Sequence, residues 1–240
     1  MKTSNFKRVL VWELPVRIFH WLNVLALIVL ILSGFLIANP PALMSSQEAT
    51  NMHYFGIVRF THFVAAYLFV AIMVVRIYWA FVGNRFARWR AFWPFRDAFW
   101  SNFWHVMKVD ILLQNEKVED VRKISIGHNS MAKISYIAMF FIALVMVFTG
   151  FGLYADMSTW WFPKMFEWVV PAMGGDYLAR TIHHICMWFF IFFSMIHVYL
   201  VLYHDWLEGR GEVSSMVGGY KFVREDRLKA EDKVKEIDPQ

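Results

Sequence analysis

Four histidines lie in apolar surroundings where an ionisable side chain is costly, and they are His20, His62, His183 and His197. Their imidazoles could relay protons, ligate a metal ion or hydrogen-bond to a neighbouring helix. A single histidine of this kind would leave all three roles open. Four of them constrain the chemistry more tightly, because their depths and the helix face that two of them share follow from their spacing.

Four apolar stretches cover about residues 18–37, 60–82, 134–153 and 182–203. The four histidines lie in the first, second and fourth of these stretches. Each stretch is long enough to cross a bilayer, which takes about 20 residues, and is too long for a buried strand. The chain is 58% hydrophobic and 18% charged, against about 45–50% and about 25% in soluble domains. This composition excludes a disordered chain and a soluble globule. We therefore predict an all-α integral membrane four-helix bundle.

Lysine and arginine are concentrated in the N-terminal segment, in the loop between the second and third stretches, and in the C-terminal tail. Residues 39–58 contain neither, and Lys164 is the only one in residues 156–177. The positive-inside rule then places both termini and the middle loop in the cytoplasm of a multi-pass inner-membrane protein. We assign the net charge of +5 to this orientation and expect no nucleic-acid partner.

This topology sorts the histidines into two layers. His62 and His183 begin helices on the outer side, whereas His20 begins a helix on the inner side. His197 follows His183 by 14 residues, which is roughly 21 Å at about 1.5 Å per residue and places it near the inner side. Because 14 residues make close to four turns, His183 and His197 share one helix face.

Two opposed imidazoles in each of two layers could ligate two flat iron porphyrins, one above the other. With both axial positions filled, such centres suit electron transfer rather than oxygen chemistry. No three or four ligands at one depth suggest zinc. Residues 18–37 and 60–82 lack the Asp or Glu expected of a proton relay. The single Cys186 excludes an all-cysteine iron–sulfur cluster and a covalent haem attachment of the CxxCH type.

Two features near the outer layer bear on this assignment. His184 competes with His183, but it lies further from the face shared with His197, so we favour His183 as the ligand. Gly34 and Gly150 lie near the outer ends of the first and third helices. Glycine there allows the close approach of a neighbouring helix or of a flat ring.

The sequence resembles the b-type cytochrome subunit of membrane-bound nickel–iron uptake hydrogenases over nearly its whole length. The matching stretches are residues 17–22, Ser33-Gly34, residues 59–63, residues 76–85, Gly127-His128-Asn129, Thr149-Gly150-Phe151, His183, residues 197–199 and residues 216–220. The block at residues 76–85 and the spaced histidines are the most specific of these.

The resemblance implies two haem b groups held by His20, His62, His183 and His197. It also implies an electron-transfer subunit of a hydrogen:quinone oxidoreductase, which takes electrons from the small and large hydrogenase subunits outside the membrane and passes them to quinone. Related cytochromes serve formate dehydrogenase and thiosulfate reductase, and a passive anchor without haem is a further alternative. The oligomeric state within the lipid bilayer stays open.

Reduction of a quinone takes up two electrons and two protons, so a polar contact near the inner haem is expected. His128 and Asn129 precede the third helix at this side and could hydrogen-bond to the headgroup, although Asn129 could equally cap the helix. An interfacial helix is expected near residues 96–113. We expect a dihaem domain in residues 1–210 and a polar, mobile cytoplasmic tail in residues 211–240.

Overall fold

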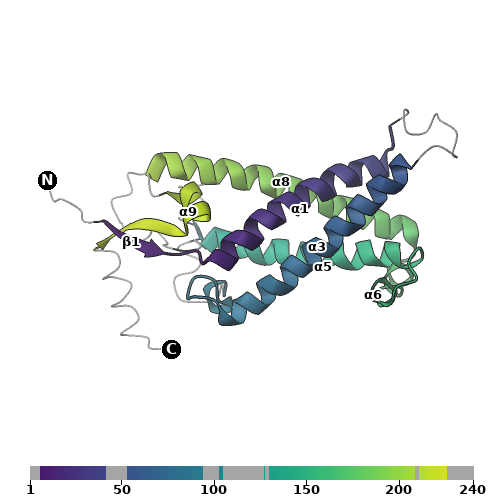
Figure 1. The fold of residues 1–240 in the computed structure, drawn as a ribbon, viewed down its shortest axis with the longest axis horizontal. Coiled ribbons are helices and arrows are strands. Elements are labelled where there is room, and N and C mark those ends of the chain that lie inside the picture. The colour runs from purple at the N-terminus through teal and green to yellow at the C-terminus, as the bar shows by residue number, and fades with distance from the viewer. Residues whose placement is uncertain are drawn as a thin grey trace. The chain divides into compact units, whose positions relative to one another are not determined.

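The computed structural model describes residues 6–41, 53–93, 103–104, 127, 130–208 and 211–225. His128, Asn129, most of the helix expected near residues 96–113 and the chain beyond residue 225 lie outside these described residues. The described elements are β1 (Phe6–Leu10), α1 (Leu14–Ala38), α3 (Tyr54–Val82), the 3-10 helix η2 (Trp89–Ala91), α5 (Ser130–Ala155), α6 (Trp161–Lys164), α7 (Val169–Ala172), α8 (Asp176–Glu208), α9 (Glu212–Gly218) and β2 (Tyr220–Arg224) (Figure 1).

Four of the described helices, α1, α3, α5 and α8, are long and apolar enough to cross a membrane, which confirms the predicted helical membrane fold. Each extends beyond its apolar run. Helix α1 begins at Leu14-Pro15, where proline is tolerated in the first turn, and ends before Pro40 and Pro41, which cannot continue it. In α1 the apolar run therefore predicts the membrane span, whereas the prolines near its two ends indicate where the helix begins and ends.

The surfaces of these helices are largely apolar and exposed in the isolated chain. Leu25 on α1, Val74 on α3 and Phe141 on α5 are among the large side chains that stay exposed. Few residues of each span are buried within the chain itself. Such apolar faces need a non-aqueous environment, which a bilayer provides.

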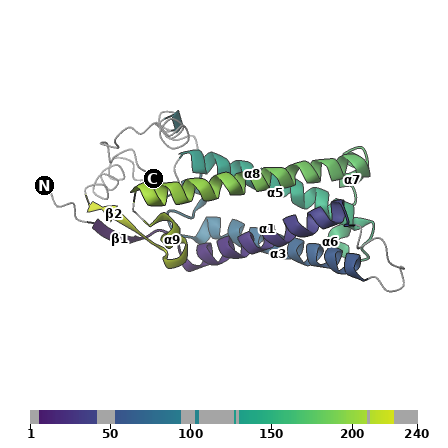
Figure 2. The same cartoon turned by 90° about the horizontal axis from the view of Figure 1, so that it is seen from above.

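The chain divides into two compact units, each built from separate stretches of sequence. Unit 1 contains Met1–Arg17, Ala80–Ile142 and Phe189–Gln240, and unit 2 contains Ile18–Trp79 and Ala143–Trp188. In unit 2, α1 and α3 run side by side in opposite directions (Figures 1 and 2). Ala65, Phe69 and Ile72 line the buried face of α3, a spacing that follows the helical repeat.

Unit 1 contains a small sheet that the sequence does not indicate. Strand β1 pairs antiparallel with β2, from Phe6 opposite Arg224 to Leu10 opposite Tyr220 (Figure 2). The backbone N–H groups of Val11 and Trp12 also donate to the carbonyl of Gly219, at 2.9 and 3.0 Å. Residues 211–225 thus form ordered structure, and the expectation of a mobile tail from Gly211 onward was wrong for this segment. The division into residues 1–210 and 211–240 stays a prediction.

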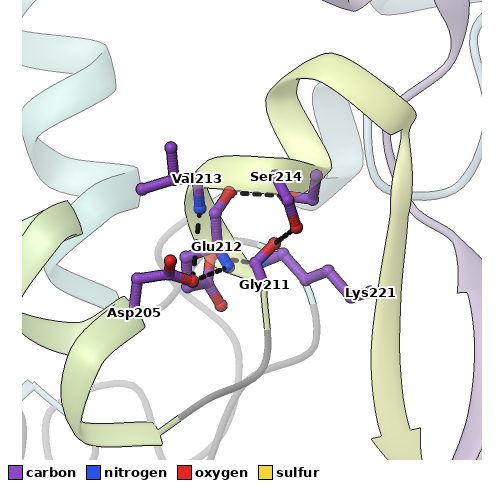
Figure 3. Close-up of polar contacts among 7 residues, drawn as sticks. Asp205, Gly211, Glu212, Val213, Ser214 and Lys221 are labelled. Carbon is purple, nitrogen blue, oxygen red and sulfur yellow. Dashed lines mark hydrogen bonds and ion pairs between the residues drawn. The ribbon is translucent and has the colours of Figure 1, made fainter.

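The end of α8 is tied to α9 and β2 by side-chain contacts (Figure 3). Oδ1 of Asp205 accepts hydrogen bonds from the backbone N–H groups of Glu212 and Val213, the first residues of α9. The ammonium of Lys221 on β2 then pairs with the carboxylate of Glu212 at 2.5 Å. A capping carboxylate at a helix N-terminus satisfies backbone donors that would otherwise have no intrahelical partner.

Candidate functional site

Unit 2 contains both histidines of the predicted outer layer. His62 lies near the start of α3, and His183 lies near the start of α8. Each imidazole contacts a hydroxyl from a neighbouring helix of the same unit. We call the pair, with the groups that hold it, the His62–His183 site.

His62 is held by a hydroxyl from α1. Its Nδ1 lies 2.9 Å from Oγ of Ser33, and the same Oγ lies 2.5 Å from the carbonyl oxygen of Val29, one turn back on α1. Ser33 is 6% exposed. A Cβ on the next residue, Gly34, would lie 3.6 Å from Cε1 of His62. The ring therefore rests against the point where α1 has no side chain.

His183 is held in the same way by α5. Its Nδ1 lies 2.8 Å from Oγ1 of Thr149, which in turn lies 2.7 Å from the carbonyl oxygen of Val145. Thr149 is fully buried. A Cβ on the next residue, Gly150, would lie only 3.0 Å from Cε1 of His183. Both imidazoles are therefore bracketed by a hydroxyl and a glycine from a neighbouring helix.

Met187 lies between the contact that α1 makes with His62 and the α8 turn that carries His183. Its sulfur would lie 3.8 Å from a Cβ on Gly34, and Met187 follows His183 by about one turn of α8. Met187 and its neighbour Cys186 are both buried. Helix α8 thus brings the apolar side chain of Met187 to the His62 side of the site, and the hydroxyls that hold the two half-buried imidazoles are themselves buried.

His184 has different surroundings from His183. Its side chain is exposed, and its Nε2 accepts a hydrogen bond from the indole N–H of Trp188 at 3.3 Å. The ring also meets Phe35 edge-on, with the centroids 6.3 Å apart. The nitrogen that a metal would need is therefore engaged, and this geometry favours His183 as the ligand.

The predicted inner histidines belong to different units. His20, in unit 2, is half-buried and meets Trp21 edge-on at 5.3 Å. Asn23, about one turn later on α1, has a buried side-chain oxygen with no hydrogen-bond partner among the described residues. His197, in unit 1, is exposed and stacks on Phe193 at 5.6 Å. The pairing of His20 with His197 stays a prediction.

The donor set fits a haem better than a bare metal ion. Within the part of the chain that the structure describes, no three His, Cys, Asp or Glu side chains gather in a way that could hold an ion. A haem needs only two axial protein ligands, since the porphyrin supplies the others. In His62 and His183, Nδ1 faces a hydroxyl, which leaves Nε2 as the nitrogen that could ligate a metal.

The sequence alone does not mark Ser33 and Thr149 as contacts of the histidines. A signal is present, because a hydroxyl residue followed by glycine occurs in both α1 and α5, as Ser33-Gly34 and Thr149-Gly150. The glycines are expected to admit a close neighbour, and the group that approaches each of them is an imidazole.

Comparison with known proteins identifies the family. A family model described as prokaryotic cytochrome b561 matches residues 11–219. A protein of Cupriavidus necator named "Probable Ni/Fe-hydrogenase B-type cytochrome subunit" is 37% identical over 92% of this chain and 90% of its own length. A protein of Azotobacter chroococcum with the same name is 37% identical over 94% and 93%. An Escherichia coli K12 protein named "Probable Ni/Fe-hydrogenase 1 B-type cytochrome subunit" is 35% identical over 92% and 93%. With this match and four helices able to span a bilayer, the chain is a multi-pass membrane protein that belongs to the prokaryotic cytochrome b561 family.

Proposed function

We propose that this chain is the membrane-anchoring dihaem cytochrome b of a nickel–iron hydrogenase, and that it passes electrons from hydrogen oxidation to the quinone pool. The relatives named as hydrogenase B-type cytochrome subunits, at 35–37% identity over most of the chain, support the partner. The observation that carries the electron-transfer role is the His62–His183 site. The Nδ1 atoms of its two imidazoles lie within hydrogen-bond distance of buried hydroxyls.

Membership of a b-type cytochrome family implies haem b, which supplies a one-electron centre when bound. In the proposal, His62 and His183 hold one haem, and His20 and His197 hold a second. Ser33 and Thr149 orient the first pair, and Met187 excludes water from it.

The proposed route runs from the outer side of the membrane to the inner side. The scarcity of Lys and Arg in residues 39–58 and 156–177 supports placing the α6–α7 segment outside. Trp161, Met165 and Trp168 are exposed in that segment, where they can meet lipid headgroups or the hydrogenase subunits. His128 and Asn129 remain the proposed quinone contacts near the inner haem, and residues 211–240 remain the proposed cytoplasmic portion.

Haem content of the four histidine variants tests this proposal. The wild-type chain is expected to carry two haem b groups, and His62→Ala, His183→Ala, His20→Ala and His197→Ala are each expected to lose one. In a complex with the hydrogenase subunits, all four should slow hydrogen-dependent quinone reduction sharply. Reduction of an artificial dye by the hydrogenase itself should continue.

The control is His184→Ala, which is expected to keep both haems because its Nε2 faces Trp188. A wild-type preparation without haem would indicate a passive anchor. Copurification in mild detergent with formate dehydrogenase or thiosulfate reductase subunits, instead of hydrogenase, would assign a different partner.

A further inference from the structure

Two segments of the molecule repeat one arrangement. A hydroxyl residue is followed by glycine on α1, as Ser33-Gly34, and on α5, as Thr149-Gly150. At each of these two places, the side chain of a histidine from another helix contacts the hydroxyl. The hydroxyl oxygens lie 2.9 and 2.8 Å from Nδ1 of His62 and His183, respectively. Recurrence in two independent helix pairs indicates a function for the hydroxyls beyond filling space.

The direction of these hydrogen bonds follows from a count of protons. A serine or threonine hydroxyl has one proton to donate and two lone pairs. Oγ of Ser33 lies 2.5 Å from the carbonyl of Val29, and Oγ1 of Thr149 lies 2.7 Å from the carbonyl of Val145. A carbonyl can only accept, so each hydroxyl donates to its own helix. Each hydroxyl oxygen must then accept from the imidazole.

This direction sets the tautomer of both rings. If the hydroxyl accepts, Nδ1 carries the proton, and Nε2 is left with a bare lone pair, the form that ligates a metal. Burial preserves the arrangement, because Ser33 is 6% exposed and Thr149 is fully buried, so water does not compete for the hydroxyls. His184 is the opposite case, since its Nε2 accepts a hydrogen bond from Trp188.

We propose that Ser33 and Thr149 are positioning residues that fix His62 and His183 in the Nδ1–H tautomer and aim Nε2 at the iron. The inference rests on the proposed function, in which these histidines hold a haem. A hydroxyl that accepts from Nδ1–H also makes the ring a stronger electron donor, which favours the oxidised iron. Loss of either hydroxyl should therefore raise the midpoint potential of the haem at this site.

The variants Ser33→Ala and Thr149→Val remove the hydroxyls, and Thr149→Val preserves the shape of the side chain. Redox titration should show one of the two haems shifted to a higher midpoint potential while the other is unchanged. The low-spin EPR signal of the same haem should change, because its imidazole plane is no longer held. The conservative variants Ser33→Thr and Thr149→Ser, which retain a hydroxyl, should restore both properties.

Thr181→Val is the matched control. Its hydroxyl donates to the carbonyl of Tyr177 one turn back on α8, at 2.8 Å, so this variant removes the same kind of back-bond two residues before His183. It should leave both potentials at the wild-type values. Unchanged potentials and EPR signals in Ser33→Ala and Thr149→Val, or the same shift in Thr181→Val, would overturn the inference.

The outcomes also separate this inference from the proposed function. A wild-type protein without haem, or His62→Ala and His183→Ala variants that keep both haems, contradicts the proposed function itself. If Thr149→Val loses haem, retention in Thr149→Ser and Thr181→Val supports the positioning role. Equal loss in all three variants would show a general packing defect and overturn it.

Discussion

His183 and His184 are adjacent in the chain, yet their side chains meet different surroundings. One contacts a buried threonine, and the other is exposed beside Trp188. Successive residues of a helix point about 100° apart, so only one of two neighbours can face a given partner helix. The chemistry of a histidine here is therefore determined by the helix face on which it lies.

The glycines beside the two imidazoles should differ in their tolerance of a methyl group. Gly150→Ala would place a Cβ 3.0 Å from Cε1 of His183, closer than ordinary packing allows, whereas Gly34→Ala leaves 3.6 Å to Cε1 of His62. We expect Gly150→Ala to displace the ring and lower the haem content. Gly34→Ala should keep haem and be neutral or stabilising by up to about 1 kcal/mol, because alanine favours helix.

Haem per chain after purification, together with the visible absorption spectrum, measures this difference. Gly56→Ala on α3 is the control, because nothing lies within 4 Å of the added Cβ. Equal haem content in Gly34→Ala and Gly150→Ala would contradict the crowding argument. Greater loss in Gly34→Ala would show that a group other than the imidazole approaches α1 there.

At this scale the sequence identifies the histidines but not the groups that hold them. His62 and His183 stand out because an ionisable imidazole is costly in an apolar membrane helix and usually has a function there. Ser33 and Thr149 do not, because a hydroxyl in a membrane helix usually bonds to its own backbone. Their contact with an imidazole depends on the rotation and packing of two helices, which no local pattern encodes.

Among the elements, α9 and β2 are held by charges that differ in exposure. The Lys221 side chain is 5% exposed and that of Glu212 is 28% exposed. The ammonium also lies 5.5 Å from the ring centroid of Trp12, which covers it. The Lys221 ammonium therefore depends on the Glu212 carboxylate for its stabilisation, because its buried position keeps it from water if the carboxylate is lost.

This difference in exposure predicts that removal of the Glu212 carboxylate and removal of the Lys221 ammonium destabilise the β1–β2 segment by different amounts. Glu212→Ala leaves a buried ammonium without its counter-charge and should destabilise the β1–β2 segment by about 2–3 kcal/mol. Lys221→Met leaves a carboxylate that water can reach, and it should cost about 1 kcal/mol or less. Hydrogen exchange of the amides in β1 and β2 measures the free energy of local opening.

The exposed pair of Lys164 and Glu167, at 3.5 Å, provides the control. Glu167→Ala should change stability by less than about 0.5 kcal/mol, as is usual for surface ion pairs. If Lys221→Met opened the sheet as readily as Glu212→Ala, the buried charge would not be the dominant factor.

The elements differ in how far their sequences predict them. The membrane spans are predictable because an apolar run of about 20 residues matches the thickness of a bilayer and exceeds the length of a buried strand. Strands β1 and β2 are not, because each has only five residues and their pairing joins distant parts of the chain. A short strand of mixed charge and hydrophobicity gives no periodic signal strong enough to show its partner. The turn at Gly219 is likewise set by a distant contact, since a Cβ there would lie 2.6 Å from the carbonyl oxygen of Trp12.

For the whole molecule, the charge asymmetry predicts an orientation that the fold alone does not determine. The sheet of β1 and β2 joins the N-terminal segment to residues 220–224, so both segments must lie on the same side of the membrane. This pairing agrees with an even number of spans. The excess of Lys and Arg in these segments predicts that this side is the cytoplasm.

Cysteine labelling with a membrane-impermeant maleimide tests this orientation. Glu167→Cys and Ser214→Cys both place a thiol at an exposed position. Glu167→Cys should react in intact cells, and Ser214→Cys should react only in inside-out vesicles. Cells that lack the hydrogenase subunits are used, so that no partner masks residue 167. The parent chain should not react from either side, because its single Cys186 is buried. Reaction of Ser214→Cys in intact cells would reverse the topology, and the proposed direction of electron flow would reverse with it.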